Sequence, residues 1–494
     1  MKGWAVTACF AAFVSIGGAE SPAAVPRGAL EPLPGAQGCV AVGGPATCAK
    51  GRALTGLSDI ALSGDGRNLY ATTREGVAIF GRARSTGALK QLRGRRGCAT
   101  ATGGKCATIR AIRVARALAV SDDGRNVYVT GFDSDAVGGS VGVVAVFARD
   151  RKTGSLTQLP GAAGCVRSDG ADGCATARAG GGLSIALSQD DGSVYVGGSE
   201  GLGVLRRDRV SGALSELAGE QGCVRRSDAP AAGCMTGRGL KVSGWSHVHS
   251  SGQGRFSQVT AIAVSPDGRS VYTVANADEG EASLAVFGRD ETTGALSQSS
   301  DATACIGAEE GCAHDLRGPF FEPSDVLVTP DGRSVYVASA GGGTGADDIG
   351  GGLTILRRNP GTGALTQPRG RGGCLQFGGG GGGCASTSTL QRNSDLAVSP
   401  DNRSVYVADS TGPDIRPSQS DARVGVLARA PRTAALTQLP GRFGCVGRSS
   451  ICTRAPATRA TRVVWVSRDG RNVYAGSSSF SDPFGALSSF RRTR

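Results

Sequence analysis

Short stretches of alternating apolar and polar residues recur along the whole chain. The clearest copy covers residues 262–274, where IAVSPDGRSVYTV contains two apolar stretches separated by an Asp-Gly pair. Alternation with a period of two is typical of a half-buried β-strand, and an Asp-Gly pair favours a tight hairpin turn. Each copy therefore predicts two antiparallel strands joined by a turn.

The pattern occurs seven times, and each copy contains one tyrosine. These tyrosines are Tyr70, Tyr128, Tyr195, Tyr272, Tyr336, Tyr406 and Tyr474. A third strand follows, as in residues 284–289, and a fourth follows a Thr-Gly turn, as in residues 295–298. Four antiparallel strands repeated radially form the blade of a propeller. The predicted fold is therefore an all-β, seven-bladed β-propeller with four antiparallel strands per blade.

The two ends of the chain predict how the ring closes. The last repeat stops after its third strand, residues 487–492, and residues 28–30 (Gly-Ala-Leu) match the fourth-strand entry at residues 294–296. An N-terminal strand at about residues 28–34 is therefore expected to complete blade seven. An open solenoid would have no reason to divide one repeat between its termini. Residues 25–494 are predicted to form this single domain.

The first 24 residues have the features of a secretory signal peptide. Lys2 is followed by an apolar stretch at residues 5–16 and then by small residues. A buried first strand is the alternative interpretation. No later segment is long and apolar enough to span a membrane, so a secreted or cell-surface protein is predicted.

The formal net charge of +13 comes mainly from arginine. Six arginines follow the hairpin turns at equivalent positions: Arg67, Arg125, Arg269, Arg333, Arg403 and Arg471. Such a spread predicts a solvated rim and not a nucleic-acid-binding stripe. Weak attraction to anionic cell-surface polymers remains open, as does a purely compositional origin of the arginines.

Fourteen cysteines form seven close pairs, one in each connection between blades, and the remaining Cys9 lies in the signal peptide. In an exported protein the expected disulfides are local: Cys39–Cys48, Cys98–Cys106, Cys165–Cys174, Cys223–Cys234, Cys305–Cys312, Cys374–Cys384 and Cys445–Cys452. Metal binding is the alternative, but zinc sites favour closer spacing and a second pair or histidines nearby. No metal site is predicted at the cysteines.

Two motifs resemble the lactonase-like seven-bladed propellers, the family that includes bacterial 6-phosphogluconolactonase and carboxymuconate lactonising enzymes. They are the S-P-D-G-R-x-V-Y-V strand–turn–strand and the F-x-R-D-x-x-T-G-A-L of residues 287–296. The resemblance covers residues 28–492 and implies the fold; the activity that it implies is hydrolysis of a small lactone. The inserted disulfide loops set this chain apart from those enzymes.

Function is expected on the face that carries the blade-to-blade connections, because the turns on the other face are uniformly short. Near the start of the innermost strands, Asp59, Asp325 and Asp395 occupy one equivalent position, and Arg116 and Arg462 come one position earlier. These side chains are candidates for binding a polar ligand. Calcium is the cation that such oxygen ligands would suit, although no cofactor is predicted. The alternative is that the aspartates cap the channel structurally.

A catalytic site is less well defined. His314, near a blade entrance, is a candidate base, with Arg116 and Arg462 as candidate oxyanion-binding residues. His247 and His249 lie in a Gly-Ser-rich insertion, which predicts a solvated loop. Solvated loops are also predicted around Asp347, Asp348, Asp414 and Asp421. The glycine tract at residues 378–383 lacks the Lys-Ser/Thr of a phosphate-binding loop.

Two functions follow as hypotheses. The first is a secreted or cell-surface binding module that recognises a protein or glycan through its disulfide-loop face. The second is a lactonase-like hydrolase of a small lactone or ester. A monomer is expected in both cases.

Overall fold

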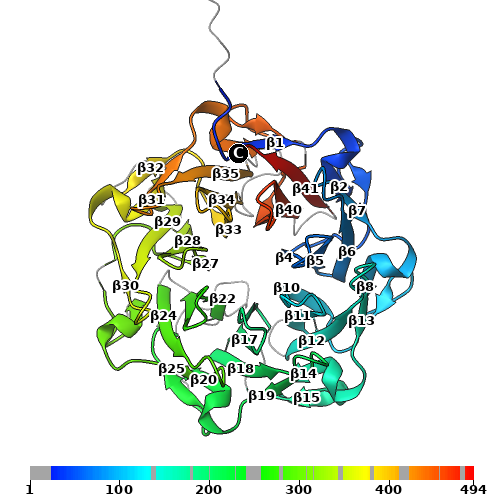
Figure 1. Cartoon of the computed structure of the whole chain (residues 1–494), viewed down its shortest axis with the longest axis vertical. Helices are drawn as coiled ribbons and strands as arrows, with labels where there is room; N and C mark the ends of the chain where they lie inside the picture. Colours follow the sequence, from blue (N-terminus) through cyan, green and yellow to red (C-terminus); the bar gives the residue numbers. More distant parts are fainter. Residues whose placement is uncertain are drawn as a thin grey trace, which may run out of the picture.

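The computed structural model forms a ring of seven β-sheets around a central axis, which confirms the predicted seven-bladed propeller (Figure 1). The structure describes residues 24–134, 141–178, 182–199, 201–227, 230–240, 258–276, 282–307, 309–314, 316–342, 349–378, 383–410, 422–455, 457–478 and 484–494. The predicted signal peptide, except for Ala24, lies outside these residues. So do His247, His249, Asp347, Asp348, Asp414 and Asp421.

Each blade runs outward from an innermost strand. The innermost strands are β4 (Asp59–Leu62), β10 (Val114–Val120), β16 (Ser184–Leu187), β22 (Gln258–Val264), β27 (Pro323–Val328), β33 (Asn393–Val398) and β39 (Thr461–Val466). The second strands are β5 (Asn68–Thr73), β11 (Asn126–Phe132), β17 (Ser193–Gly198), β23 (Ser270–Asn276), β28 (Ser334–Gly342), β34 (Ser404–Asp409) and β40 (Asn472–Ser478). The third strands are β6 (Gly76–Arg82), β12 (Gly142–Arg149), β18 (Gly201–Arg207), β24 (Ala282–Arg289), β29 (Ile349–Arg358), β35 (Arg423–Arg429) and β41 (Gly485–Arg492).

The outermost predicted strand is divided into two pieces, both paired with the third strand. The first pieces are β1 (Leu30–Pro32), β7 (Leu89–Gln91), β13 (Leu156–Gln158), β19 (Leu214–Glu216), β25 (Leu296–Ser297), β30 (Leu365–Thr366) and β36 (Leu436–Gln438). The second pieces are β2 (Cys39–Val42), β8 (Cys98–Thr100), β14 (Cys165–Arg167), β20 (Cys223–Arg226), β26 (Cys305–Gly307), β31 (Cys374–Phe377) and β37 (Cys445–Gly447). Between them lie the 3-10 turns η1 (Gly35–Gln37), η2 (Gly94–Gly97), η3 (Gly161–Gly164), η5 (Gly219–Gly222), η7 (Ala302–Ala304), η8 (Gly370–Gly372) and η10 (Gly441–Gly444).

The disulfides explain a feature that the repeat pattern did not predict. In six blades a short fifth strand pairs with the second piece of the outermost strand, and this pairing is parallel. These strands are β3 (Ala49–Lys50), β9 (Ala107–Thr108), β15 (Ala175–Thr176), β21 (Met235–Gly237), β32 (Ala385–Thr387) and β38 (Thr453–Arg454). All seven predicted disulfides are present, with Cα–Cα separations from 4.8 to 4.9 Å. Each therefore ties the outer edge of its blade to the chain that leaves it.

The hairpin turns have the backbone that the sequence predicts, with one exception. Gly66 and Asn402 adopt positive φ values of 64° and 57° at the second turn position, a region that glycine and asparagine tolerate best. In blade three this position is Asp191, with φ 57°, so that turn is Asp190–Asp191. The Asp191 carboxylate accepts hydrogen bonds of 2.8 Å from the backbone N–H groups of Asp122 and Asp123 in blade two, which compensates for the less favourable residue.

Ring closure follows the prediction. The N-terminal strand β1 pairs antiparallel with β41, with Leu30 opposite Arg492, and completes blade seven. Figure 1 shows β1 beside β41. Tyr406 of blade six also donates a hydrogen bond of 2.8 Å to the carbonyl of Gly28, so the first residues of the ring are bound to both neighbouring blades.

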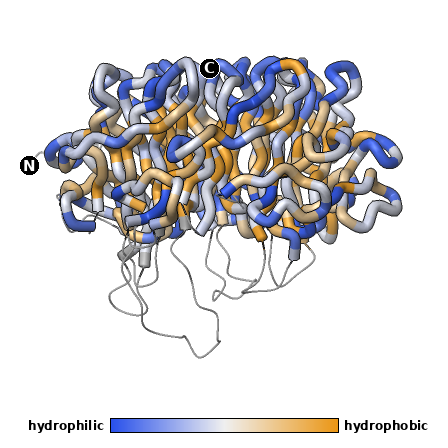
Figure 2. Tube along the Cα trace, turned by 90° about the horizontal axis from the view of Figure 1, so that it is seen from below, coloured by the Kyte–Doolittle hydropathy of each residue, from blue (hydrophilic) through white to orange (hydrophobic). Residues whose placement is uncertain are grey.

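Apolar positions fill the layers between the blades, and Figure 2 shows them concentrated between the two faces of the disc. All seven repeat tyrosines are fully buried there. Tyr474 donates a hydrogen bond of 2.8 Å to the Gly87 carbonyl and accepts one of 2.6 Å from Arg82, which also pairs with Asp469 at 3.0 Å. The same tie recurs from blade to blade as Arg149–Tyr70–Asp65, Arg207–Tyr128–Asp123, Arg289–Tyr195–Asp190, Arg358–Tyr272–Asp267, Arg429–Tyr336–Asp331 and Arg492–Tyr406–Asp401.

Arginines thus serve two purposes in the repeat. The predicted solvated rim is confirmed, since Arg67 and its five equivalents are exposed. The arginine that ends each third strand is buried instead and holds neighbouring blades together. In the sequence, the Arg of the F-x-R-D motif marks this position.

Candidate functional site

A cavity of about 310 Å³ lies where the innermost strands begin, at the centre of the ring. All seven blades contribute to it, each through at least two consecutive residues. The first row of the cavity wall consists of Ser58, Arg116, Leu183, Thr260, Ser324, Ser394 and Arg462. The second row consists of Asp59, Ala117, Ser184, Ala261, Asp325, Asp395 and Val463. The cavity therefore brings together five of the residues that the sequence singled out.

Local irregularity of the strands explains why two consecutive residues face the same space. In five blades the pairing of the innermost with the second strand shifts by one residue at the first row, between Ala115 and Ala117 in blade two for example. Such a β-bulge leaves one residue unpaired and redirects its side chain. Arg116 and Arg462 are both bulge residues.

The aspartates of the second row connect neighbouring blades. Asp59 accepts hydrogen bonds from the backbone N–H groups of Ile60, at 2.7 Å, and of Leu118 in blade two, at 2.9 Å. Asp325 and Asp395 repeat this arrangement toward blades six and seven. The structural role that was the alternative in the sequence is therefore present. Alanine stands at the same position in blades two and four, so a blade can form without this carboxylate.

Burial changes the acidity of these groups. It raises the pKa of Asp59 to about 7, against the opposing effect of its two backbone hydrogen bonds. Burial also raises the pKa of Asp325 to about 6. The pKa of Asp395 is raised by burial and by the neighbouring charge of Asp325. Burial therefore raises the pKa of all three carboxyls, and it brings those of Asp59 and Asp325 close to neutral pH.

No metal site is evident in the part of the chain that the structure describes, where no group of three or more His, Cys, Asp and Glu side chains is placed to hold an ion. The carboxylate oxygens of the three aspartates instead accept hydrogen bonds from backbone N–H groups. Calcium binding stays a prediction that these contacts do not support.

The arginines of the first row differ from their neighbours. Ser58, Thr260 and Ser324 donate hydrogen bonds of 2.9–3.2 Å to backbone carbonyls of the next blade. The Arg116 guanidinium has no hydrogen bond or ion pair with any described residue; its carbon lies 5.9 Å from the centre of the Phe132 ring.

The charges of the arginines act on one another. Burial and, less strongly, the charge of Arg74 lower the pKa of Arg116. Burial and the charge of Arg116 lower the pKa of Arg462. Two cations thus share one cavity wall, on either side of blade one, at a cost in desolvation and mutual repulsion. An anion placed between them would reduce both costs.

The structure separates His314 from this cavity. His314 is exposed, next to the Cys305–Cys312 disulfide, and does not line the cavity wall. Its predicted cooperation with Arg116 and Arg462 is therefore not supported by their positions. The disulfide loops likewise lie at the outer edges of the blades and contribute no residue to the cavity.

The sequence did not single out the serines and threonine of the first row. They align with Arg116 and Arg462, one position before the aspartates, and the same alignment would have found them. Phe132, which lies against Arg116, carries no such signal, because the contact depends on how β11 and β10 are paired.

Comparisons with known proteins found solved structures of low similarity and no related sequence family. No family model and no curated protein sequence matches the chain. A putative 6-phosphogluconolactonase from Bacteroides uniformis is similar in structure, with a TM-score of 0.49 and 15% identity over 82% of this chain and 85% of the other. A periplasmic gluconolactonase from Pseudomonas aeruginosa has a TM-score of 0.45 and 15% identity over 85% of this chain and 96% of its own. A hydrazine synthase from Kuenenia stuttgartiensis has a TM-score of 0.46 and 15% identity, with coverages of 89% and 96%.

These solved structures differ in the activities that their names describe. Propellers support many unrelated functions, and at this level of similarity no reaction or ligand is carried over to the present chain. In the described residues, no helix is long and apolar enough to cross a membrane.

Proposed function

We propose that this chain is an extracellular binding module, and that its protein or glycan ligand places an anionic group in the central cavity between Arg116 and Arg462. The observation that carries the proposal is the position of these two cations on one cavity wall, where Arg116 has no carboxylate partner among the described residues. Guanidinium groups suit the planar geometry of a carboxylate and bind it through paired hydrogen bonds.

The cavity favours a small anionic group over a large surface contact. Its volume of about 310 Å³ matches a single sugar acid or a carboxylate side chain. The hydroxyls of the first row add polar groups around the arginines. The seven disulfides support an extracellular setting, because such bonds persist in oxidising compartments.

Calorimetric titration with a panel of uronic and hydroxy acids tests the proposal, with neutral sugars of the same size as the reference ligands. Arg116→Ala and Arg462→Ala are each expected to weaken acid binding by about tenfold, the usual effect of losing a charge-assisted contact. Arg403→Ala removes an exposed arginine at a hairpin turn and should leave the affinity unchanged. Equal binding of acids and neutral sugars, or an unchanged affinity in both cavity variants, would contradict the proposal.

A lactone hydrolase is the second candidate, and one feature of the same cavity favours it. Burial raises the pKa of Asp59 to about 7, which is a suitable range for a general base at neutral pH. In the reaction, Asp59 would take a proton from water as the water oxygen attacks the lactone carbonyl, with the arginines near the developing oxyanion. The ring C–O bond then breaks, and the alkoxide takes up the proton to give a hydroxy acid.

Turnover distinguishes the two candidates, since a hydroxy acid would bind in both. The hydrolase predicts measurable opening of small lactones, with a rate that rises as the pH passes through about 7 because ionised Asp59 is the base. Asp59→Ala and Arg116→Ala should lower this rate, and His314→Ala, predicted from the sequence, should be measured beside them. A purified protein that opens no lactone of the panel, with or without calcium, excludes this candidate.

A further inference from the structure

The central cavity carries charges of both signs, arranged in two layers. Each first-row residue precedes its second-row neighbour along the innermost strand, so Arg116 and Arg462 lie one residue closer to the start of the strands than the aspartates do. The second row contains the carboxyls of Asp59, Asp325 and Asp395. A ligand that fills the cavity therefore meets a cationic layer and an anionic layer.

Like charges gather within each layer. Burial and then the charge of Arg116 lower the pKa of Arg462. Burial and then the charges of Asp325 and Asp59 raise the pKa of Asp395. Repulsion between like charges costs free energy in both layers, and a ligand group of the opposite charge reduces it. The cationic layer favours an anion, and the anionic layer favours a cation.

The carboxylates of the anionic layer have acceptor capacity left for a ligand. Each oxygen of Asp325 and Asp395 accepts one backbone N–H, whereas a carboxylate oxygen has two lone pairs. One of these donors is shared: the nitrogen of Leu396 lies 3.0 Å from an oxygen of Asp325 and 2.9 Å from an oxygen of Asp395. The two carboxylates therefore meet at a single hydrogen atom, and a further donor with a positive charge would satisfy both.

A primary ammonium group suits this layer better than a metal ion does. It carries three N–H donors on one positive charge, so it can donate to both carboxylates at once. Calcium takes about six to eight oxygen ligands, and in the described part of the chain no group of acidic side chains is placed to hold an ion.

We propose that the group which the ligand places in the central cavity is a zwitterion: its carboxylate binds at Arg116, and its primary ammonium group binds at Asp325 and Asp395. An amino acid or an amino sugar acid has this chemistry. The inference rests on the proposed function, since it keeps the anion at the arginines and adds a second charged group to the same ligand.

Calorimetry with the full chain tests the inference at a pH of about 8, where Asp325, with a pKa of about 6, is ionised and an aliphatic amine is still protonated. The probes are γ-aminobutyrate, δ-aminovalerate and ε-aminocaproate, each compared with the plain carboxylic acid and the plain amine of the same length. The wild-type protein is expected to bind at least one of these amino acids about tenfold more tightly than the matched acid, the usual effect of one more charge-assisted contact.

Variants locate the two ends of the ligand. Asp325→Asn and Asp395→Asn should each remove the advantage of the amino acid without weakening the binding of the plain acid, whereas Arg116→Ala should weaken both. Glu220→Gln is the matched control, because Glu220 is an exposed carboxylate in η5 at the outer edge of blade three; it should bind both ligands as the wild type does. Thermal unfolding of each variant checks that the fold is intact, and the ligand series with the wild type needs no variant.

The outcomes separate this inference from the proposed function. Plain acids that bind as tightly as the amino acids would overturn the inference and leave anion binding at the arginines intact. Failure of the acids and of the amino acids to bind would contradict both. An advantage of the amino acids that survives in both aspartate variants would also overturn the inference, because the ammonium group would then bind elsewhere.

Discussion

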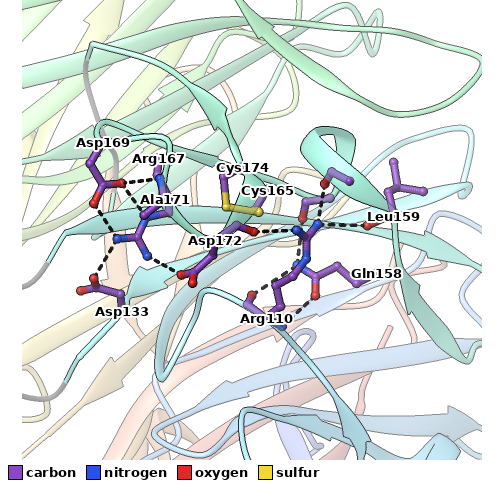
Figure 3. The surroundings of a disulfide bond; sticks show 12 residues. Arg110, Asp133, Gln158, Leu159, Cys165, Arg167, Asp169, Ala171, Asp172 and Cys174 are labelled. Atoms are coloured by element: carbon purple, nitrogen blue, oxygen red, sulfur yellow. Dashed lines mark hydrogen bonds and ion pairs between the residues drawn. A yellow bond between two sulfur atoms is a disulfide. The ribbon is translucent and has the colours of Figure 1, made fainter.

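Two disulfide loops of this propeller use arginine in opposite ways. In blade two, Arg167 lies beside the Cys165–Cys174 disulfide and is surrounded by carboxylates: it contacts Asp169 at 2.7 Å, Asp172 at 2.9 Å and Asp133 at 3.0 Å (Figure 3). In blade six, Arg448 and Arg454 flank the Cys445–Cys452 disulfide and have no such partner among the described residues. Both blades have the same disulfide-closed loop, but only the loop of blade two surrounds its arginine with carboxylates.

The difference shows that the same disulfide-closed loop can hold its arginine in ion pairs in one blade and leave it exposed in another. The Arg167 side chain is only 4% exposed, and its guanidinium forms ion pairs within the protein. Figure 3 also shows Arg110, from the preceding connection, donating a hydrogen bond of 2.8 Å to the Asp172 carbonyl inside the loop. Every charge in the blade-two loop therefore has an internal partner, whereas Arg448, the one charged residue of the blade-six loop, has no carboxylate partner among the described residues.

The largest expected effect comes from removing the disulfides. Replacing both cysteines of either pair by alanine should lower the free energy of unfolding by about 2–3 kcal/mol, because a short crosslink restricts the unfolded chain. Urea unfolding measures this loss. Hydrogen exchange should then differ between the loops: residues 445–452 should exchange faster, while residues 165–174 stay protected by the Arg167 ion pairs. Equal loosening of both loops would show that these ion pairs do not hold the structure.

Next in size is the effect of Arg167→Ala. It leaves three carboxylates close together without their cation and should cost about 2 kcal/mol of unfolding free energy. Arg448→Ala, the matched change in blade six, should stay within about 0.5 kcal/mol, as exposed substitutions usually do. Both values come from urea unfolding at neutral pH. A comparable loss in the two variants would mean that Arg448 also has an internal structural role.

The pH dependence of the same pair of variants is a smaller effect. Hydrogen bonding to Arg167 lowers the pKa of Asp169 to about 2. Because the folded-state pKa lies below the ordinary value of 3.8, this stabilisation is complete above pH 4 and disappears as the pH falls through about 2. The difference between wild type and Arg167→Ala should therefore shrink over this range. The small difference caused by Arg448→Ala should not change with pH, which thermal unfolding at several pH values can check.

The smallest change in stability is expected when a carboxylate is introduced beside the loop arginine of blade six, as in blade two. Ser450→Asp places a carboxylate in the exposed part of the Cys445–Cys452 loop, near Arg448. Stability should change by about 0.5 kcal/mol or less, since exposed ion pairs contribute little. Urea unfolding measures this change. Ser450→Asn is the neutral control and should be as stable as the wild type.

Much of the architecture was predictable because each repeat contains the sequence signals for its own strands and turns. Apolar alternation, Asp-Gly turns and one tyrosine per copy predicted seven blades, and the divided last repeat predicted the pairing of β1 with β41. The parallel fifth strands were not predictable, because two or three residues such as Thr453 and Arg454 are too few to show a period. The turn at Asp190–Asp191 was obscured by the glycine that follows it.

The candidate site was predictable only in part, for a related reason. Aligning the repeats placed Asp59, Asp325 and Asp395 in one row and Arg116 and Arg462 in the row before it. It could not show that the aspartates bond to the next blade, or that His314 lies outside the cavity, since both depend on contacts between blades.

The sequence by itself determined the number of blades, the ring closure and the pairing of the cysteines, because these follow from local patterns that are repeated along the chain. Only the tertiary structure decided which arginines are neutralised and which are presented to solvent. Arg167 has two of its carboxylate partners, Asp169 and Asp172, in its own loop, and the fold adds Asp133 from an earlier connection. The third-strand arginines instead depend on carboxylates of the neighbouring blade, such as Asp469 for Arg82, which only the packing of the blades brings close.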